Sequence, residues 1–248
     1  MTVQAVILAG GEGKRIHPLG VNKPKAMFPI MGQPLIQFVV DNLRRAGITD
    51  LIIVTGPAHD QIRDYFGDGS DRGLTIQYAL QPEPLGQANA VLMAEGLVRG
   101  NFFILNANDI FEPQLLKRVM SRAAESGANL ALVGRRVAEP WRFGVMGFDE
   151  SGRLAQVVEK PPAGQEPSDI AVVGVYYASP GIFNHIRRAP AGQTDDQFER
   201  AYQRFIDRGE AIYVQYDGLF ESYKYPWNLL TISDMLLQQR IAGRRISP

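Results

Sequence analysis

The chain has no cysteine, few histidines and no long hydrophobic run. Its 248 residues include no Cys and 3 His, which excludes disulfide bonds, thiolate nucleophiles and the usual zinc frameworks. His17, His59 and His185 are far apart in the sequence, and their spacing indicates neither a histidine-rich metal centre nor a Ser-His-Asp site. Any catalytic function must therefore rest on other residue types.

The chain also lacks a net charge and a membrane-spanning segment. Lys and Arg total 26, as do Asp and Glu, so no global field favours nucleic acid or an acidic membrane surface. Any anion site must therefore be local. No run approaches the roughly 20 apolar residues of a membrane span, and the apolar stretch 3–8 is too short for a secretion signal. We expect a cytoplasmic protein with neither a nucleic-acid nor a membrane partner.

Short apolar runs alternate with amphipathic stretches along the first half of the chain. The pattern predicts strands at 3–8, 51–54, 74–80 and 102–105 and helices at 35–46, 60–66, 86–98 and 113–125. A regular alternation of this kind is typical of a parallel sheet with helices on both faces. For the whole chain we expect an α/β fold with a mixed, mostly parallel central sheet that has helices on both faces.

The second half has a different pattern. It predicts a hairpin of strands 143–148 and 154–158 around the turn 149–152, strands at 171–178 and 211–216, and helices at 180–188, 195–207 and 226–240. No low-complexity linker divides the chain, and the breaker-rich segment 161–167 lies between two predicted strands. The sequence therefore predicts a single domain at 1–240, followed by a tail at 241–248.

A glycine-rich and cationic loop follows the first predicted strand. Gly10, Gly11 and Gly13 allow backbone N–H groups to approach a phosphate closely, because no Cβ intervenes. Arg15 and Lys25 would be fixed cations at the two ends of this loop. Such a segment is suited to wrapping a triphosphate.

Two familiar phosphate-binding motifs do not match this loop. A P-loop needs a glycine where Leu8 stands and a hydroxyl residue directly after Lys14, where Arg15 stands. A dinucleotide-binding fingerprint beginning at Gly11 needs a glycine where Ile16 stands. We therefore favour the triphosphate interpretation.

The loop resembles the signature of a known enzyme family. Segments L-A-G-G-E-G-K-R-I-H-P-L at 8–19 and P-K-A-M-F-P-I at 24–30 resemble the sugar-1-phosphate nucleotidylyltransferases, of the glucose-1-phosphate thymidylyltransferase and uridylyltransferase type. Later segments resemble the family in the family's own order, at 78–81, 143–145, 159–161 and 173–176. The resemblance implies a Rossmann-like nucleotidyltransferase fold, with a nucleotide half at about 1–110 and a sugar half at about 111–240.

The resemblance implies transfer of a nucleotidyl group from UTP or dTTP to a hexose-1-phosphate, with glucose-1-phosphate as the first candidate, and release of pyrophosphate. The attacking phosphate oxygen is already anionic, so no general base is needed, and catalysis consists of positioning and electrostatics. Three implied catalytic residues would hold phosphates: Arg15 the triphosphate and leaving group, Lys25 the α-phosphoryl oxygens and Lys160 the sugar phosphate.

The resemblance also implies binding roles for other residues. The nucleotide-binding residues would be Leu8, Gly10, Gly11, Gly13, Gln81 and Gly86, and the sugar-binding residues Gly144, Glu159 and Val173. Gln81 has an amide that can match the edge of a pyrimidine base, although it could also be an ordinary polar strand end. Asp109 would bind Mg²⁺, although the residues alone also allow it to cap a following helix.

One segment departs from the family pattern. Where the family commonly has W-x-D-[IV]-G-x-P-W-[DN], this chain has F-E-S-Y-K-Y-P-W-N at 220–228. Ser222 stands in place of a metal-binding Asp, and Lys224 in place of a Gly. A serine hydroxyl is a weaker, neutral ligand, and on a strand the adjacent Glu221 would point to the opposite face. Lys14 adds a cation to the loop that could partly offset the reduced metal charge.

These departures leave other interpretations open. The chain could be a weak or inactive regulatory homologue that binds nucleotide-sugars, or a mannose-1-phosphate guanylyltransferase if Gln81 does not read the base. The C-terminal I-S-P at 246–248 resembles the lead into a left-handed β-helix domain of relatives. The expected partners are a nucleoside triphosphate and a sugar-1-phosphate, and a homo-oligomer is compatible with the resemblance.

Overall fold

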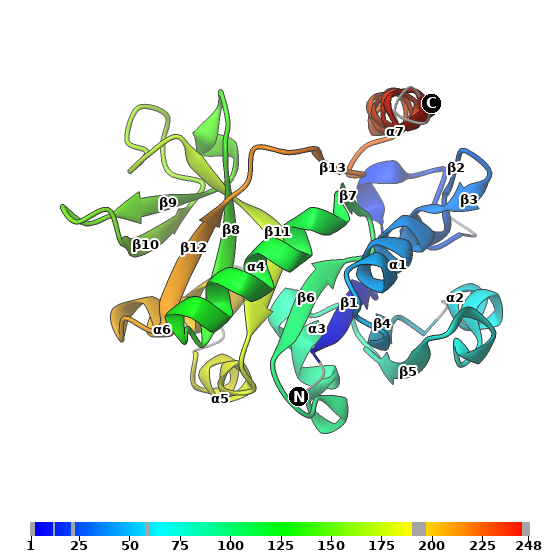
Figure 1. Cartoon of the computed structure of the whole chain (residues 1–248), viewed down its shortest axis with the longest axis horizontal. Coiled ribbons are helices and arrows are strands. Elements are labelled where there is room, and N and C mark those ends of the chain that lie inside the picture. The colour runs from blue at the N-terminus through cyan, green and yellow to red at the C-terminus, as the bar shows by residue number, and fades with distance from the viewer. Residues whose placement is uncertain (1–2, 12, 21–22, 58–59, 190–196, 245–248) are drawn as a thin grey trace.

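A nine-stranded sheet forms the centre of the protein (Figure 1). The computed structural model describes residues 3–11, 13–20, 23–57, 60–189 and 197–244, so His59, the start of the helix predicted at 195–207 and the end of the tail lie outside the described residues. The first half contributes four parallel strands in the order β6-β1-β4-β5. Their bounds are β1 (Gln4–Ala9), β4 (Asp50–Thr55), β5 (Thr75–Leu80) and β6 (Phe102–Asn106).

The second half extends this sheet through a long antiparallel strand. β11 (Ile170–Ala178) pairs with β6 on one side and with β8 and β9 on the other. The remaining strands of this sheet are β8 (Leu130–Arg136), β9 (Gly144–Phe148), β10 (Leu154–Glu159) and β12 (Ala211–Gln215). β9 and β10 form the hairpin predicted around 149–152, whereas β12 runs parallel to β8.

Helices cover both faces of the sheet because its strands carry apolar side chains on both sides. α1 (Leu35–Arg45), α2 (Asp60–Phe66) and α4 (Pro113–Ser126) pack on one face, and α3 (Gly86–Met93), α5 (Gly181–Arg188) and α6 (Gln197–Asp207) on the other. Successive strand residues alternate between these layers, so Ile7 and Ile53 join the first core and Val6 and Ile52 the second. The predicted Rossmann-like α/β fold with a mixed, mostly parallel sheet is confirmed.

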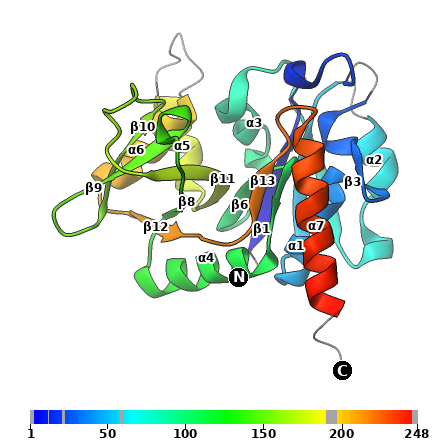
Figure 2. The same cartoon turned by 90° about the horizontal axis from the view of Figure 1, so that it is seen from above.

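A third, smaller core joins the two ends of the chain. Ile232 and Leu236 of α7 (Asn228–Arg244) pack with Ile16, Leu35 and Ile110. Figure 2 shows α7 on the same side of the molecule as α1 and α2. The C-terminal helix therefore packs against Ile16 of the signature loop.

Four small strands, in two pairs, complete the description of this region. β2 (Pro29–Ile30) and β3 (Gln33–Pro34) form a tight hairpin, in which Met31 and Gly32 have φ angles of 51° and 85°. β7 (Asp109–Phe111) pairs antiparallel with β13 (Phe220–Ser222). The strands β2, β3, β7, β8 and β13 are absent from the sequence-based prediction, and α3 ends earlier than predicted and is followed by a short 3-10 helix at Glu95–Leu97.

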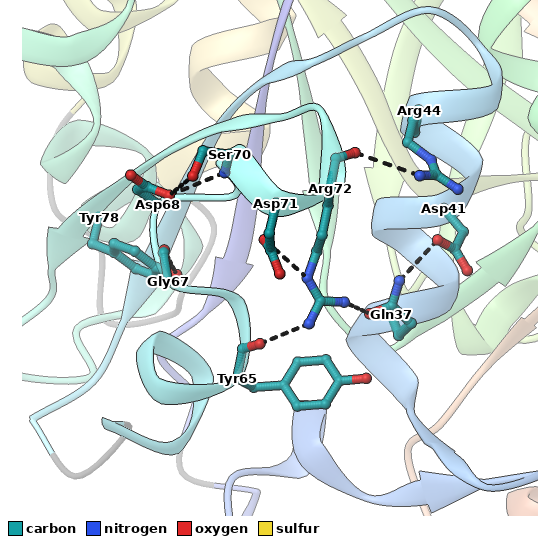
Figure 3. Close-up of polar contacts among 10 residues, drawn as sticks. All are labelled: Gln37, Asp41, Arg44, Tyr65, Gly67, Asp68, Ser70, Asp71, Arg72 and Tyr78. Atoms are coloured by element: carbon teal, nitrogen blue, oxygen red, sulfur yellow. Dashed lines mark hydrogen bonds and ion pairs between the residues drawn. The ribbon is translucent and has the colours of Figure 1, made fainter.

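The outer edge of the nucleotide half is fixed by a polar network around Arg72 (Figure 3). Arg72 Nη1 donates to Gln37 Oε1 at 3.1 Å, and Nη2 donates to the carbonyl oxygen of Tyr65 at 2.9 Å. The guanidinium also lies 5.0 Å from the Tyr65 ring centroid and 5.3 Å from that of Phe66. This network ties α1 and α2 to the turn before β5.

Among the described helices, none has the length and apolar character needed to cross a membrane.

Candidate functional site

A pocket of about 240 Å³ opens where β1 and β6 end side by side. β1 pairs with β4 on one side and β6 on the other, so the order of strands along the chain reverses here. Ligands of open α/β sheets bind beyond the carboxyl ends of the strands at such a switch point. The walls come from the end of β1 with its glycine loop, from Lys25 and Ala26, from the segment around Gln81 and the start of α3, and from residues 106–108.

The glycine loop forms one wall of this pocket. Gly10 and Gly11 line it, and a Cβ on Gly10 would lie 2.5 Å from Gln81 Oε1. Gly13 has a φ of 66°, a backbone conformation that favours glycine, and turns the chain into the short 3-10 helix Lys14–Ile16. Leu8 also lines the pocket. Arg15 is exposed in that 3-10 helix, at the outer end of the loop.

Gln81 is buried and its side chain has a fixed orientation. It directly follows the edge strand β5 and is only 4% exposed. Its Nε2 donates to the Gly86 carbonyl oxygen at 3.1 Å and to Asn89 Oδ1 at 3.0 Å. With both amide hydrogens engaged, Oε1 is the atom that faces Gly10 and can accept a further hydrogen bond. Gln81 and Gly86 are therefore brought together, as the motif order predicts.

Asp109 lies just beyond the end of β6, buried to 2% exposure. Its Oδ2 accepts a hydrogen bond from Asn106 Nδ2 at 2.9 Å, and its Oδ1 accepts one from Ser222 Oγ at 2.6 Å. Burial raises the pKa of Asp109, and the hydrogen bonds from Ser222 and Asn106 oppose this shift. Asp109 begins β7 and does not cap α4, whose N-cap residue is Glu112. The alternative interpretation of Asp109 as a helix cap is therefore wrong.

The departure from the family pattern lies inside this site. Antiparallel pairing of β13 with β7 sets Ser222 opposite Asp109. Asn108 Nδ2 also donates to Ser222 Oγ at 3.1 Å, so the serine is held between the two residues. Glu221 instead accepts a hydrogen bond at 3.4 Å from Asn228 of α7, in keeping with the alternation expected along a strand.

Lys25 brings positive charge to the pocket. It begins the 3-10 helix Lys25–Met27 and lines the wall beside Ala26. Burial lowers the pKa of Lys25, the Asp109 carboxylate opposes that shift, and the charges of Lys224 and Arg15 add to it. Three cations and one carboxylate therefore share one local field, which suits a polyanionic ligand.

The predicted sugar-binding residues lie on the β9–β10 hairpin and β11. Gly144 pairs with Glu159, and a Cβ on Gly144 would lie 2.9 Å from Glu159 Oε2. Lys160 has a φ of 45°, a strained conformation for a non-glycine residue that is common at functional sites. Its Nζ lies 3.4 Å from Glu159 Oε1. Val173 is 7% exposed and packs in the first core. The residues that line the pocket include none of these four.

Several residues of the site are missing from the sequence-based prediction. Asn106 and Asn108 line the pocket and donate hydrogen bonds to Asp109. Gln87, at the start of α3, also lines the pocket. The asparagines follow a buried strand at the edge where ligands collect, so their position was a usable signal. The proximity of Lys224 to Lys25 depends on β13 pairing with β7, which no local pattern indicates.

The donor set at Asp109 suits a magnesium ion that arrives with a nucleotide. Across the described ranges, no group of three or more His, Cys, Asp or Glu side chains could hold a metal by itself. Magnesium is commonly bound by one or two carboxylates together with substrate phosphates, and Asp109 can supply one such carboxylate. Ser222 supplies a neutral oxygen beside it.

A Rossmann-like sheet with a glycine-rich loop at its switch point is the architecture of nucleotide-binding α/β proteins. Residues 4–222 match the family model described as nucleotidyl transferase, and the chain belongs to this family. The family indicated by the motifs at 8–30 is thereby confirmed.

Two relatives illustrate the sequence similarity. The chain is 29% identical over 248 residues to the low-salt glycan biosynthesis nucleotidyltransferase Agl11 of Haloferax volcanii, covering 98% of this chain and 68% of that protein. It is 36% identical over 177 residues to a glucose-1-phosphate thymidylyltransferase of Neisseria gonorrhoeae, covering 71% of this chain and 61% of that enzyme. The chain thus spans about two thirds of the length of these relatives.

Two solved structures share the fold over almost the whole of this chain. A UDP-glucose pyrophosphorylase complexed with UDP-glucose superposes with a TM-score of 0.86 at 25% identity, covering 96% of this chain and 100% of that chain. A glucose-1-phosphate thymidylyltransferase structure from Bacillus anthracis has a TM-score of 0.84 at 22% identity, covering 94% of this chain and 95% of that chain. The second likeness, at this identity, concerns the fold alone.

Proposed function

We propose that the protein transfers a nucleotidyl group from UTP or dTTP to a hexose-1-phosphate, with glucose-1-phosphate as the first candidate. The products would be a nucleotide-sugar and pyrophosphate. The observation that carries the proposal is the pocket at the switch point, which joins the glycine loop, Lys25 and an oriented Gln81. The names of the relatives support the same reaction class, one being a glucose-1-phosphate thymidylyltransferase and another a UDP-glucose pyrophosphorylase with UDP-glucose bound.

Gln81 would select the base through a single acceptor. Its Nε2 hydrogens are engaged by Gly86 and Asn89, so Oε1 remains to accept the N3–H of uracil or thymine. Cytosine and adenine have a ring acceptor at the equivalent position, which this oxygen would repel. Guanine has an N1–H that could satisfy the same acceptor. Guanylyl transfer is thus compatible even with Gln81 as the base reader, and transfer to mannose-1-phosphate remains the second candidate.

The phosphates would be bound by cations and backbone N–H groups. The sugar-phosphate oxygen would attack the α-phosphorus while the bond to the pyrophosphate group breaks, and pyrophosphate would leave with the electron pair. Lys25 would stabilise charge on the α-phosphoryl oxygens, and Arg15 would hold the departing pyrophosphate. Lys160 would orient the incoming phosphate. No proton has to be removed from the attacking oxygen, so no catalytic base is required.

The proposed metal and sugar contacts follow from the same arrangement. Asp109, with Ser222 beside it, would hold Mg²⁺, which would neutralise part of the triphosphate charge. Glu159 would accept hydrogen bonds from sugar hydroxyls, and the absence of a side chain at Gly144 leaves room for the Glu159 carboxylate. Val173 would contribute to the sugar-side wall through the β11 backbone.

The decisive test is pyrophosphate release by the purified protein. UTP, dTTP, GTP, ATP and CTP would each be combined with glucose-1-phosphate or mannose-1-phosphate, with magnesium and with a chelator. We expect magnesium-dependent release with UTP or dTTP that is lost in Asp109→Asn. Asp64→Asn, an exposed carboxylate on α2, is the matched control and should retain full activity.

Two results would contradict this proposal in different ways. Release with GTP and mannose-1-phosphate alone would favour the guanylyltransferase. Absence of release with every pair, together with nucleotide-sugar binding in a calorimeter, would favour the regulatory homologue. Activity restored by Ser222→Asp would then assign the inactivity to the missing carboxylate.

A further inference from the structure

Lys224 occupies a defined position in the loop between β13 and α7. The residue before it, Tyr223, is fully buried in the third core, and its backbone N–H donates to the Asn108 carbonyl oxygen at 3.0 Å. The backbone N–H groups of Lys224 and Tyr225 both donate to Asn228 Oδ1, at 3.1 and 2.7 Å. The backbone is therefore held on both sides of Lys224, and its side chain starts from a fixed point.

The side chain of Lys224 lies between the two halves of the site. Its Nζ is 5.6 Å from the ring centroid of Phe143, which directly precedes the predicted sugar-binding Gly144. The Phe143 carbonyl oxygen accepts a hydrogen bond at 3.0 Å from the backbone N–H of Lys160. On the nucleotide side, the charge of Lys224 acts on both Lys25 and Asp109. One ammonium group thus contacts the ring next to Gly144 and acts electrostatically on Lys25 and Asp109.

The charges around Lys224 favour the binding of an anion. Asp109 accepts hydrogen bonds from the neutral donors Asn106 and Ser222, and no ion pair among the described residues joins it to a lysine. Lys25, Arg15 and Lys224 consequently share a field with one carboxylate. The contact of an exposed ammonium with an aromatic ring is weak. A phosphate group can therefore draw Lys224 away from Phe143.

We propose that Lys224 is a further catalytic residue that binds the substrate phosphates opposite Lys25 and bridges the nucleotide and sugar sides. This inference rests on the proposed function, because it assigns a contact within the same reaction. With Ser222 and Lys224 together, the segment 220–228 offers a hydroxyl and an ammonium on a held backbone where the family pattern has a carboxylate and a glycine. The chain would thus supply part of the required positive charge itself.

The test measures binding apart from turnover. The affinities of UTP and of inorganic pyrophosphate would be measured by calorimetry in a chelator, for wild type, Lys224→Met, Lys224→Arg and Lys117→Met. We expect Lys224→Met to weaken both affinities about tenfold and to reduce the dependence of affinity on salt concentration. Lys224→Arg should keep most of the affinity. Lys117→Met removes the same charge from an exposed position on α4 and should bind like wild type.

Catalysis provides the second readout. Because Lys224 would supply charge independently of the metal, Lys224→Met should need more magnesium for half-maximal rate. The double variant Ser222→Asp with Lys224→Gly restores both family residues and should depend on magnesium more steeply than wild type.

The outcomes separate this inference from the proposed function. Equal affinities in wild type and Lys224→Met would overturn the role of Lys224, even if nucleotidyl transfer is observed. An equal loss in Lys117→Met would also overturn it, because the effect would then be one of net charge. A wild-type protein that binds both ligands but releases no pyrophosphate would contradict the proposed function while the affinity comparison still decides the role of Lys224. Failure of the wild type to bind either ligand would overturn both.

Discussion

The two sides of the candidate site differ in how firmly their residues are held. On the nucleotide side, Gln81 and Asp109 are 4% and 2% exposed, and hydrogen bonds fix their side chains. On the sugar side, the side chains of Glu159 and Lys160 are 39% and 65% exposed and contact each other. The nucleotide side is therefore preorganised, whereas the sugar side can complete its geometry when a ligand binds.

The sheet explains this difference. Asp109 follows β6, a strand inside the sheet with helices on both faces. Gln81 follows the edge strand β5, but its bonds to Gly86 and Asn89 hold it against the start of α3. β10 is the last strand in the order of the sheet, and much of it is exposed. The half predicted to bind the larger polyanion thus holds its site residues more firmly.

The largest predicted effect is a difference between Lys25 and Lys160, two of the lysines that would hold phosphates. Lys25→Met should lower kcat by about 100-fold to 1000-fold, because it removes a preorganised cation from the reacting phosphate. Lys160→Met should act mainly on the KM for the sugar phosphate, because Lys160 is exposed and paired with Glu159. Initial rates over both substrates would measure this split. An equal loss of kcat in both variants would contradict the comparison.

A glycine beside Asp109 provides the next test. A Cβ added at Gly174 would lie 2.3 Å from both Asn106 Nδ2 and Asp109 Oδ2, so β11 or the site must shift. Gly174→Ala should destabilise the fold by about 1–3 kcal/mol and should also lower activity. Thermal unfolding and initial rates would show both effects. Gly100→Ala, where a Cβ meets nothing within 4 Å, is the control. An unchanged melting temperature in Gly174→Ala would show that the packing at Asp109 is loose.

Gly10 tests the preorganised base contact alone. Its added Cβ would lie 2.5 Å from Gln81 Oε1, so Gly10→Ala should displace the Gln81 carboxamide. We expect the KM for the nucleoside triphosphate to rise about tenfold, with a smaller change in the KM for the sugar phosphate. Steady-state kinetics would distinguish the two. A rise confined to the sugar phosphate would place the base elsewhere.

The smallest effect belongs to the sugar side. Glu159→Gln removes an exposed ion pair with Lys160, and such pairs contribute about 0–1 kcal/mol. The free energy of unfolding should therefore change little, while the KM for the sugar phosphate should rise about threefold to tenfold. Urea denaturation and kinetics would measure these values. Marked destabilisation with unchanged kinetics would make Glu159 a structural residue.

The sequence predicts the parallel part of the fold well because its strands are apolar runs bounded by turn residues. The runs at 51–54 and 102–105 are short, continuous and followed by amphipathic segments, which is the pattern of a buried parallel sheet. β8 went unpredicted although Leu130 to Val133 is also an apolar run. β7 and β13 have three residues each, too few for any periodicity to appear.

The candidate site was likewise predictable only where the sequence has a clear local pattern. The neighbourhood of Gly10 and Gln81 was predictable because their motifs resemble a family whose members have a shared order of segments. The position of Lys224 was not, because it depends on pairing between strands more than a hundred residues apart. Its role can be seen only once Ser222 and Asp109 are side by side.

The most direct test of the account is a crystal structure of the protein with UTP. The account predicts that the base lies with its N3–H on Gln81 Oε1 and that the phosphates lie between Gly10, Gly11 and Lys25. A nucleotide bound outside the pocket at the ends of β1 and β6 would contradict the central claim. So would a base that contacts Gln81 through its Nε2, because both hydrogens of that atom are engaged in the protein.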